Sequence, residues 1–359
     1  MTLAAFYTNA IPPTTLRLVL LGASAFMLYG AGRLVMGVVP ARADRPTLRA
    51  LLGAALVLAV AIVSIVMGRP GIGLHLPIAC AAAAMTFGIG SLILGRTHPS
   101  DPSAGNPSWA LVAPAIAITL FAGLSGRFDA MPIAALIAFG VAAMFAWREA
   151  PEVIVEGEAS HVHRDAPTPL VILFWIGGIA LAGLAGVLVM LGLPGLETSG
   201  IPSDPLAVVF LLAPAIVVPI FFELLPPCKT LGWDGSISVL AKFALINLCF
   251  CLPLVALVQA DAGVIRGLWL ANAISNTATA TQPATAEVVA ATDAATTIEF
   301  PSLPAIPLRS DLLVLAGAML LIVPLAAGWQ KPGGLEAAAL IACYFLSLGL
   351  VMASVLWRR

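Results

Sequence analysis

The chain has 359 residues, of which 60% are hydrophobic and only 10% are charged, and its formal net charge is −1. A water-soluble domain could not cover its surface with so few polar residues, and the balanced charge offers no basic surface for nucleic acid. The composition therefore predicts a multi-pass membrane protein, with the lipid bilayer as its first partner.

Five apolar segments precede a charged stretch that begins at Arg148. Each has about 18 to 25 residues, the length that a helix needs to cross the hydrocarbon. We place them at roughly 14–38, 47–67, 75–95, 107–125 and 130–147. Apolar and polar residues do not alternate with a period of two, so we expect helices rather than a β-barrel.

Five more apolar segments follow in the second half of the chain. We place them at roughly 169–194, 205–225, 236–259, 311–328 and 335–357. Residues 149–168 form a polar, mostly acidic linker, and 260–309 is a long loop rich in Ala and Thr. Within that loop, residues 264–274 form either a short interfacial helix or more loop.

A near-repeat links the two halves. The hexapeptide AGRLVM at 31–36, in the first segment, returns as AGVLVM at 185–190 in the sixth, and an ALIA stretch recurs at 135–138 and 339–342. Because five spans separate equivalent segments, the second half enters the bilayer from the opposite face. We expect an all-α polytopic fold of about ten transmembrane helices in two inverted five-helix repeats, at 1–148 and 169–359.

The basic residues that follow the first segment predict the orientation. Arg42, Arg45 and Arg49 form the first positive cluster, which usually faces the cytoplasm. The N-terminus and the 260–309 loop are then extracytoplasmic, whereas the 149–168 linker is cytoplasmic. We expect a protein of the bacterial inner membrane whose first span is not removed as a signal peptide.

Two stretches resemble a known family. The segment LLGASAFMLYGAGRLVMG at 20–37 is similar to the opening helix of the cation/calcium exchanger superfamily. The segment KPGGLEAAALIACYFLSL at 331–348 is similar to the last helix of that superfamily. The resemblance implies ten spans in two halves, a cytoplasmic linker and an ion site between the halves. It also implies exchange of monovalent or divalent cations and protons across the membrane.

The ion-binding motifs of that family are degenerate in this chain. The family has Gly-Thr-Ser-x-Pro-Glu in the second helix of each half and Gly-x-x-x-Gly-Ser-Asn-x-x-Asn in the third, but 47–67 has no acidic residue. Glu223 and Asn247 fall where the resemblance puts the second glutamate and the last asparagine. Lys242 and Phe243 stand where the family has Gly and Ser.

Glu223 and Lys242 are the ionisable residues deepest in the second-half spans. Such residues are costly in a bilayer and mark functional sites. One interpretation pairs the two as a coupling site, behind a helix broken by Pro214 and Pro219. In the other, Lys242 snorkels to the headgroups and Glu223 faces the interface.

The remaining polar candidates also allow two interpretations. Several hydroxyl and amide side chains in the spans are either ion ligands or groups that bond one helix to another: Thr86, Ser91, Thr119 and Asn247. His161 and His163 form either a weak metal site or part of an acidic linker. Gly88 and Gly90 permit close helix packing, and the cysteines are small core residues.

The sequence contains none of the common enzyme motifs, and it predicts no cofactor. The leading hypothesis is a cation/proton antiporter of exchanger-like fold that uses Glu223, Lys242 and Asn247, together with Ser91 or Thr86 from the opposite half. The alternative is a non-transporting membrane scaffold or assembly factor on the same fold. An unrelated ten-helix protein is a third possibility.

Overall fold

A computed structural model of the chain describes residues 14–37, 46–94, 107–125, 130–149, 168–193, 206–231, 233–259, 312–318, 320–321 and 334–356. Within these ranges the backbone is helical except at 67–69 and 193. Seven of the described helices are long and apolar enough to cross a membrane. The protein is thus an all-α, multi-pass membrane protein, as the composition predicts. Most of the 149–168 linker and all of 260–309 lie outside the described residues.

The helices of the first half fall close to their predicted places. They are α2 (Thr14–Gly37), α3 (Pro46–Val66), the continuous span α4 (Pro70–Ala83), η2 (Ala84–Gly88) and α5 (Ile89–Leu94), then α6 (Pro107–Ser125) and α7 (Ala130–Glu149). The third span begins at Pro70, five residues before the predicted start at 75. Proline suits the first turn of a helix, where its missing N–H would have no intrahelical acceptor.

The second half has the same order of elements. It comprises α8 (Thr168–Gly192), the span of η3 (Ala207–Leu212) and α11 (Ala213–Leu231), the span of α12 (Trp233–Ile246) and η4 (Asn247–Cys251) that continues to 259, helical residues at 312–318 and 320–321, and α16 (Gly334–Leu356). The expected break at Pro214 and Pro219 is wrong, because α11 continues through both prolines. A π-helical turn, η3, precedes Pro214 and can absorb the loss of a helical hydrogen bond there.

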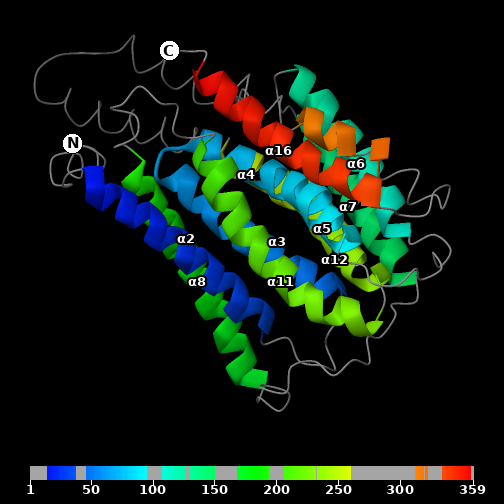
Figure 1. The fold of residues 1–359 in the computed structure, drawn as a ribbon, viewed down its shortest axis with the longest axis horizontal. Coiled ribbons are helices and arrows are strands. Elements are labelled where there is room, and N and C mark those ends of the chain that lie inside the picture. Colours follow the sequence, from blue (N-terminus) through cyan, green and yellow to red (C-terminus); the bar gives the residue numbers. More distant parts are fainter. Residues whose placement is uncertain are drawn as a thin grey trace, which may run out of the picture.

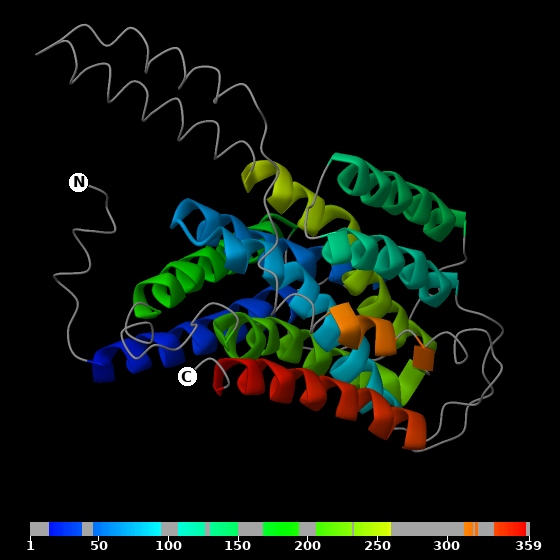
Figure 2. The same cartoon turned by 90° about the horizontal axis from the view of Figure 1, so that it is seen from above.

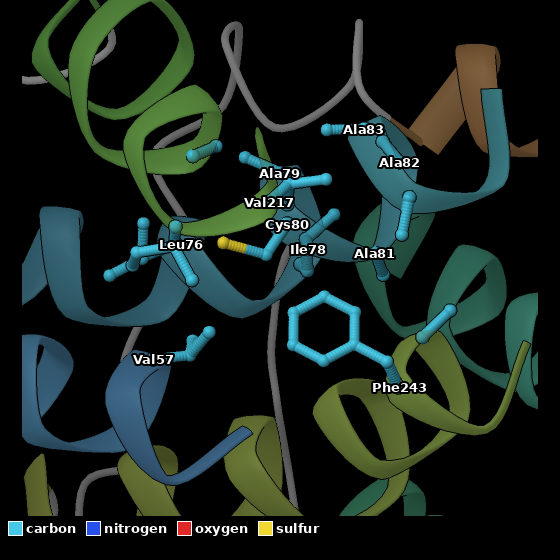
Figure 3. Close-up of a cluster of buried hydrophobic side chains, with 14 of the residues drawn as sticks. Val57, Leu76, Ile78, Ala79, Cys80, Ala81, Ala82, Ala83, Val217 and Phe243 are labelled. Atoms are coloured by element: carbon cyan, nitrogen blue, oxygen red, sulfur yellow. The ribbon is translucent and has the colours of Figure 1, made fainter. Parts of the chain in front are cut away.

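The helices are arranged around two buried spans. In 70–94 and 237–259, 89% of the residues in the apolar stretch are buried, against 28% in α2 and α8. Figure 1 shows α2 and α8 side by side along one edge, with α6, α7 and α16 on the far side of the central helices. Residues at the meeting of four central helices interlock in Figure 3: Val57 of α3, Cys80 of α4, Val217 of α11 and Phe243 of α12.

The repeated hexapeptide makes equivalent contacts in the two halves. In both copies the Ala, Gly, Val and Met positions are buried. Gly32 packs α2 against Pro219 of α11, and Gly186 packs α8 against Val60 and Val63 of α3. The first helix of each half therefore crosses the second helix of the other half, which is the exchange of partners that an inverted repeat requires.

Two π-helical turns occupy equivalent places in the third helices. The segments η2 and η4 each follow a 14-residue α-helix, and 163 residues separate both the helix starts (70 and 233) and the turns (84 and 247). Phe87 and Phe250 are the fourth residues of these turns. Phe87 meets Tyr344 of α16, with ring centroids 5.5 Å apart, and Phe250 meets Gly140 of α7. The helices α7 and α16, equivalent in the repeat, lie beyond the same edge of the central helices in Figure 1, but the view from above in Figure 2 shows them on opposite faces.

Candidate functional site

Lys242 is a buried cation in the middle of a spanning helix. Its side chain is only 4% exposed, and its Nζ donates a hydrogen bond of 3.0 Å to Oγ1 of Thr47, in the first turn of α3. The same Nζ lies 5.3 Å from the ring centroid of Trp147, in the last turn of α7. The ammonium therefore points toward the end of the bundle where α3 begins and α7 ends, yet it stays inside the protein.

This position combines features of the two interpretations of Lys242. The backbone of Lys242 lies nine residues into α12, about 14 Å along a helix that crosses roughly 30 Å of hydrocarbon. The side chain reaches back from that depth, as a snorkelling lysine does. Its ammonium, however, meets a hydroxyl and an indole ring and is almost completely buried.

Glu223 lies on the neighbouring helix at a similar level. It is nine residues before position 232 and Lys242 is ten residues after it, and α11 packs against α12. In an antiparallel pair, positions equally far from the connection stand side by side. The side chain of Glu223 lies outside the described residues, so its pairing with Lys242 stays a prediction.

Thr86 and Asn247 bond to their own helices. Thr86 Oγ1 donates to the carbonyl of Ala82 at 2.6 Å, and Asn247 Nδ2 donates to the carbonyl of Phe243 at 2.9 Å. The predicted alternative of bonds between helices is thus wrong for these two donors. Thr119 likewise donates within its own helix. Ser91 lies half-buried in α5.

Asn247 also keeps a buried acceptor without a partner. The residue is fully buried in η4, and among the described residues its Oδ1 accepts no hydrogen bond. An unsatisfied buried amide oxygen costs about 1–3 kcal/mol, so its retention needs a reason. An amide oxygen is also a suitable ligand for hard cations.

The equivalent positions of the first half lack such groups. Adding 163 relates Ala84 to Asn247 and Ala79 to Lys242, and both alanines are buried. Ser64, the one hydroxyl of α3 after Thr47, donates to the carbonyl of Val60 within its own helix. The two repeats are therefore alike in backbone geometry and unlike in polarity.

Nothing in the sequence marks three further residues of interest. Thr47 and Trp147 each stand at the end of a helix, 195 and 95 positions from Lys242, and no sequence spacing links them to it. His75 of α4 is only 3% exposed. The apolar segment predicts a start at 75, whereas α4 starts at Pro70, so this imidazole lies more than one turn inside the helix.

The described residues contain no group of three or more His, Cys, Asp or Glu side chains placed to hold a metal ion. His161 and His163 lie outside those residues. Cys80, Cys249 and Cys251 are buried as predicted, and Cys251 Sγ donates to the carbonyl of Ala54 at 3.6 Å. Gly88 and Gly90 do permit close packing, since a Cβ on either would lie 2.9 Å from a neighbouring side chain.

Comparison with solved structures identifies the fold. The chain is similar to the H+/Ca2+ exchanger CAX (TM-score 0.68, 13% identity, covering 99% of this chain and 89% of that one). It is also similar to the Ca2+/H+ antiporter protein YfkE (TM-score 0.61, 14% identity, 96% and 94%) and to the sodium-calcium exchanger NCX_Mj (TM-score 0.52, 14% identity, 94% and 99%). No family model and no curated protein matches the chain. The protein has the fold of the Ca2+/cation exchangers, with two inverted five-helix repeats, despite the low identity.

Proposed function

We propose that the protein is a secondary transporter of the bacterial inner membrane that exchanges cations for protons, with its N-terminus outside. The observation that carries the proposal is the buried ammonium of Lys242 in a spanning helix of an exchanger fold. A charge held in a membrane bundle costs several kcal/mol and usually marks an ion pathway. Solved relatives of this fold are named as exchangers of Ca2+, Na+ or H+.

Glu223 and Lys242 are the proposed coupling groups. A carboxylate at Glu223 can be neutralised by a proton, by a transported cation or by the ammonium of Lys242, and the three compete because each occupies the same carboxylate. Exchange follows when binding of one cation displaces another. The register of α11 and α12 supports this role, because it puts both residues at a similar level.

Oxygen ligands for the cation are proposed on both halves. Asn247 supplies an amide oxygen that accepts no other hydrogen bond within the described residues. The hydroxyls of Thr86 and Ser91 come from the opposite repeat, and a hydroxyl that donates to a backbone carbonyl keeps its lone pairs for a cation. Together with Glu223, these groups form the proposed set of hard ligands.

A scaffold without transport is the second candidate, and a specific observation favours it. The residues equivalent to Asn247 and Lys242 in the first half are alanines, and the α3 segment carries no acid. The site therefore lacks, in the first half, the acidic partner that the resemblance to the exchangers implies. On this hypothesis, Lys242 locks a bundle that assists assembly of other membrane proteins.

Flux measurements in reconstituted vesicles separate the two candidates. Vesicles containing a pH-sensitive dye receive an outward proton gradient, and Na+, K+ or Ca2+ is then added outside. For an antiporter, at least one cation dissipates the gradient, Glu223→Gln abolishes this flux, and the control Glu336→Gln, at the start of α16, does not. Absence of flux with all three cations from the unmodified protein would leave the scaffold as the function.

A further inference from the structure

We infer that Thr47 and Trp147 form a receptor for an ammonium group, and that the side chain of Lys242 is its tethered occupant. Thr47 and Trp147 belong to α3 and α7 of the first repeat, whereas Lys242 belongs to α12 of the second. The contact between the receptor and Lys242 thus joins the two halves of the fold. The receptor itself is inferred from contacts, and only the coupling role of Lys242 rests on the proposed function.

The geometry fits a primary ammonium. The hydroxyl oxygen of Thr47 accepts at 3.0 Å, and the indole ring lies 5.3 Å away, within the roughly 6 Å over which a ring attracts a cation. A compact ammonium has three donors around one atom and can use both surfaces at once. The receptor therefore suits primary alkylammonium ions.

Contacts of the ring face, rather than a hydrogen bond of the indole N–H, orient Trp147. It is buried, and within the described residues its Nε1–H has no hydrogen-bond partner. A buried indole usually finds an acceptor for this N–H. The absence of one indicates that contact of the ring with Lys242 and its neighbours, rather than an indole hydrogen bond, determines its orientation.

An added alkylammonium ion can compete with Lys242 for the receptor. Lys242 meets the receptor at a high effective concentration because both belong to one folded chain. Movement of α12 relative to α3 and α7 has to withdraw the ammonium from the receptor. An alkylammonium ion that fills the receptor would then favour the arrangement in which Lys242 is withdrawn.

Chemical rescue tests the receptor directly. Lys242→Ala removes Cγ, Cδ, Cε and Nζ, which are the atoms of n-propylammonium. At ten times its dissociation constant, n-propylammonium should raise the melting temperature of this variant in detergent by about 2 °C. Neither 1-propanol, which has no charge, nor the same ion added to Lys242→Met, whose side chain fills the space, should give this shift. Equal shifts in Lys242→Ala and Lys242→Met, or with 1-propanol, would overturn the inference.

A second measurement applies if Lys242→Ala does not fold. Trp147→Phe keeps an aromatic face, whereas Trp147→Met keeps an apolar side chain without one. Amide hydrogen exchange in α12 should be faster in Trp147→Met than in Trp147→Phe, and equal rates would contradict the receptor. Neither experiment measures flux, so a negative result here leaves the proposed antiport standing, and absence of flux leaves the receptor standing.

Discussion

Gly32 of α2 lies so close to Pro219 of α11 that a Cβ at position 32 would come within 2.5 Å of the proline ring. A ring fixed in a helix cannot move aside as a flexible side chain can. We therefore expect Gly32→Ala to lower the free energy of unfolding by about 1–3 kcal/mol, the usual cost of overpacking. Thermal or denaturant unfolding in detergent measures this loss.

Two other glycines provide controls for that substitution. Gly22, on the same helix, has no neighbour within 4 Å of a Cβ, and at Gly186 the nearest atom would be 3.4 Å away. Alanine should be tolerated at both positions and should raise helix propensity. If Gly32→Ala is as stable as Gly22→Ala, the packing of α2 on α11 is looser than described.

The second prediction concerns Glu223 and Lys242. If they form a buried pair, Lys242→Met strands a carboxylate and should cost up to about 3–5 kcal/mol of stability. The double variant Lys242→Met, Glu223→Gln leaves no uncompensated charge and should be more stable than the single variant. Unfolding of the three proteins under one set of conditions makes this comparison. Equal stability of the single and double variants would refute the pair.

The third prediction uses the unsatisfied oxygen of Asn247. Leucine at this position removes a buried acceptor that has no partner among the described residues, together with the hydrogen bond that the amide donates to the carbonyl of Phe243, so Asn247→Leu should change the stability by no more than about 1 kcal/mol. In an antiporter the same change should abolish cation flux, because a ligand is lost. Thr119→Val, in which the hydroxyl lost is already bonded to Ala115, should leave flux intact. Flux that survives in Asn247→Leu would remove this residue from the site.

The fourth prediction concerns topology. In a variant with Cys228 and Cys343 changed to serine, a cysteine at Thr281 should react with a membrane-impermeant maleimide in whole cells, and one at Ser160 should not. The remaining Cys80, Cys249 and Cys251 are buried and should not react. Labelling at 160 but not at 281 would invert the orientation.

Much of the fold could be predicted from the sequence because few backbone structures can span a bilayer. An apolar run of the required length has to be helical to satisfy its backbone, so most spans were placed to within a few residues. The hexapeptide at 31–36 and 185–190 predicted the inverted repeat because five spans, an odd number, separate its copies, and in the structure its glycine lies at a helix crossing in each half. Such contacts depend on residue size, which a sequence shows.

The site was harder to predict, since its contacts join distant residues. Lys242 was recognised as an ionisable residue in an apolar helix, but nothing in the sequence links it to Thr47, 195 positions away. The turns η2 and η4 have no sequence in common except phenylalanine at the fourth position. For α11, proline suggested a broken helix, whereas a widened turn upstream keeps the helix continuous.

The unequal partners of the two π-helical turns have a thermodynamic consequence. Phe250 packs on a glycine in α7, while Phe87 packs on Tyr344 and lies 6.0 Å from Phe221 in α11. An aromatic pair adds about 0.5–1.5 kcal/mol beyond the area it buries. A state in which each half adopted the conformation of the other would therefore not have the same free energy as the present one. If the chain alternates between two arrangements, as the proposed antiport requires, these arrangements differ in free energy, and a ligand has to bind the less stable one more tightly in order to populate it.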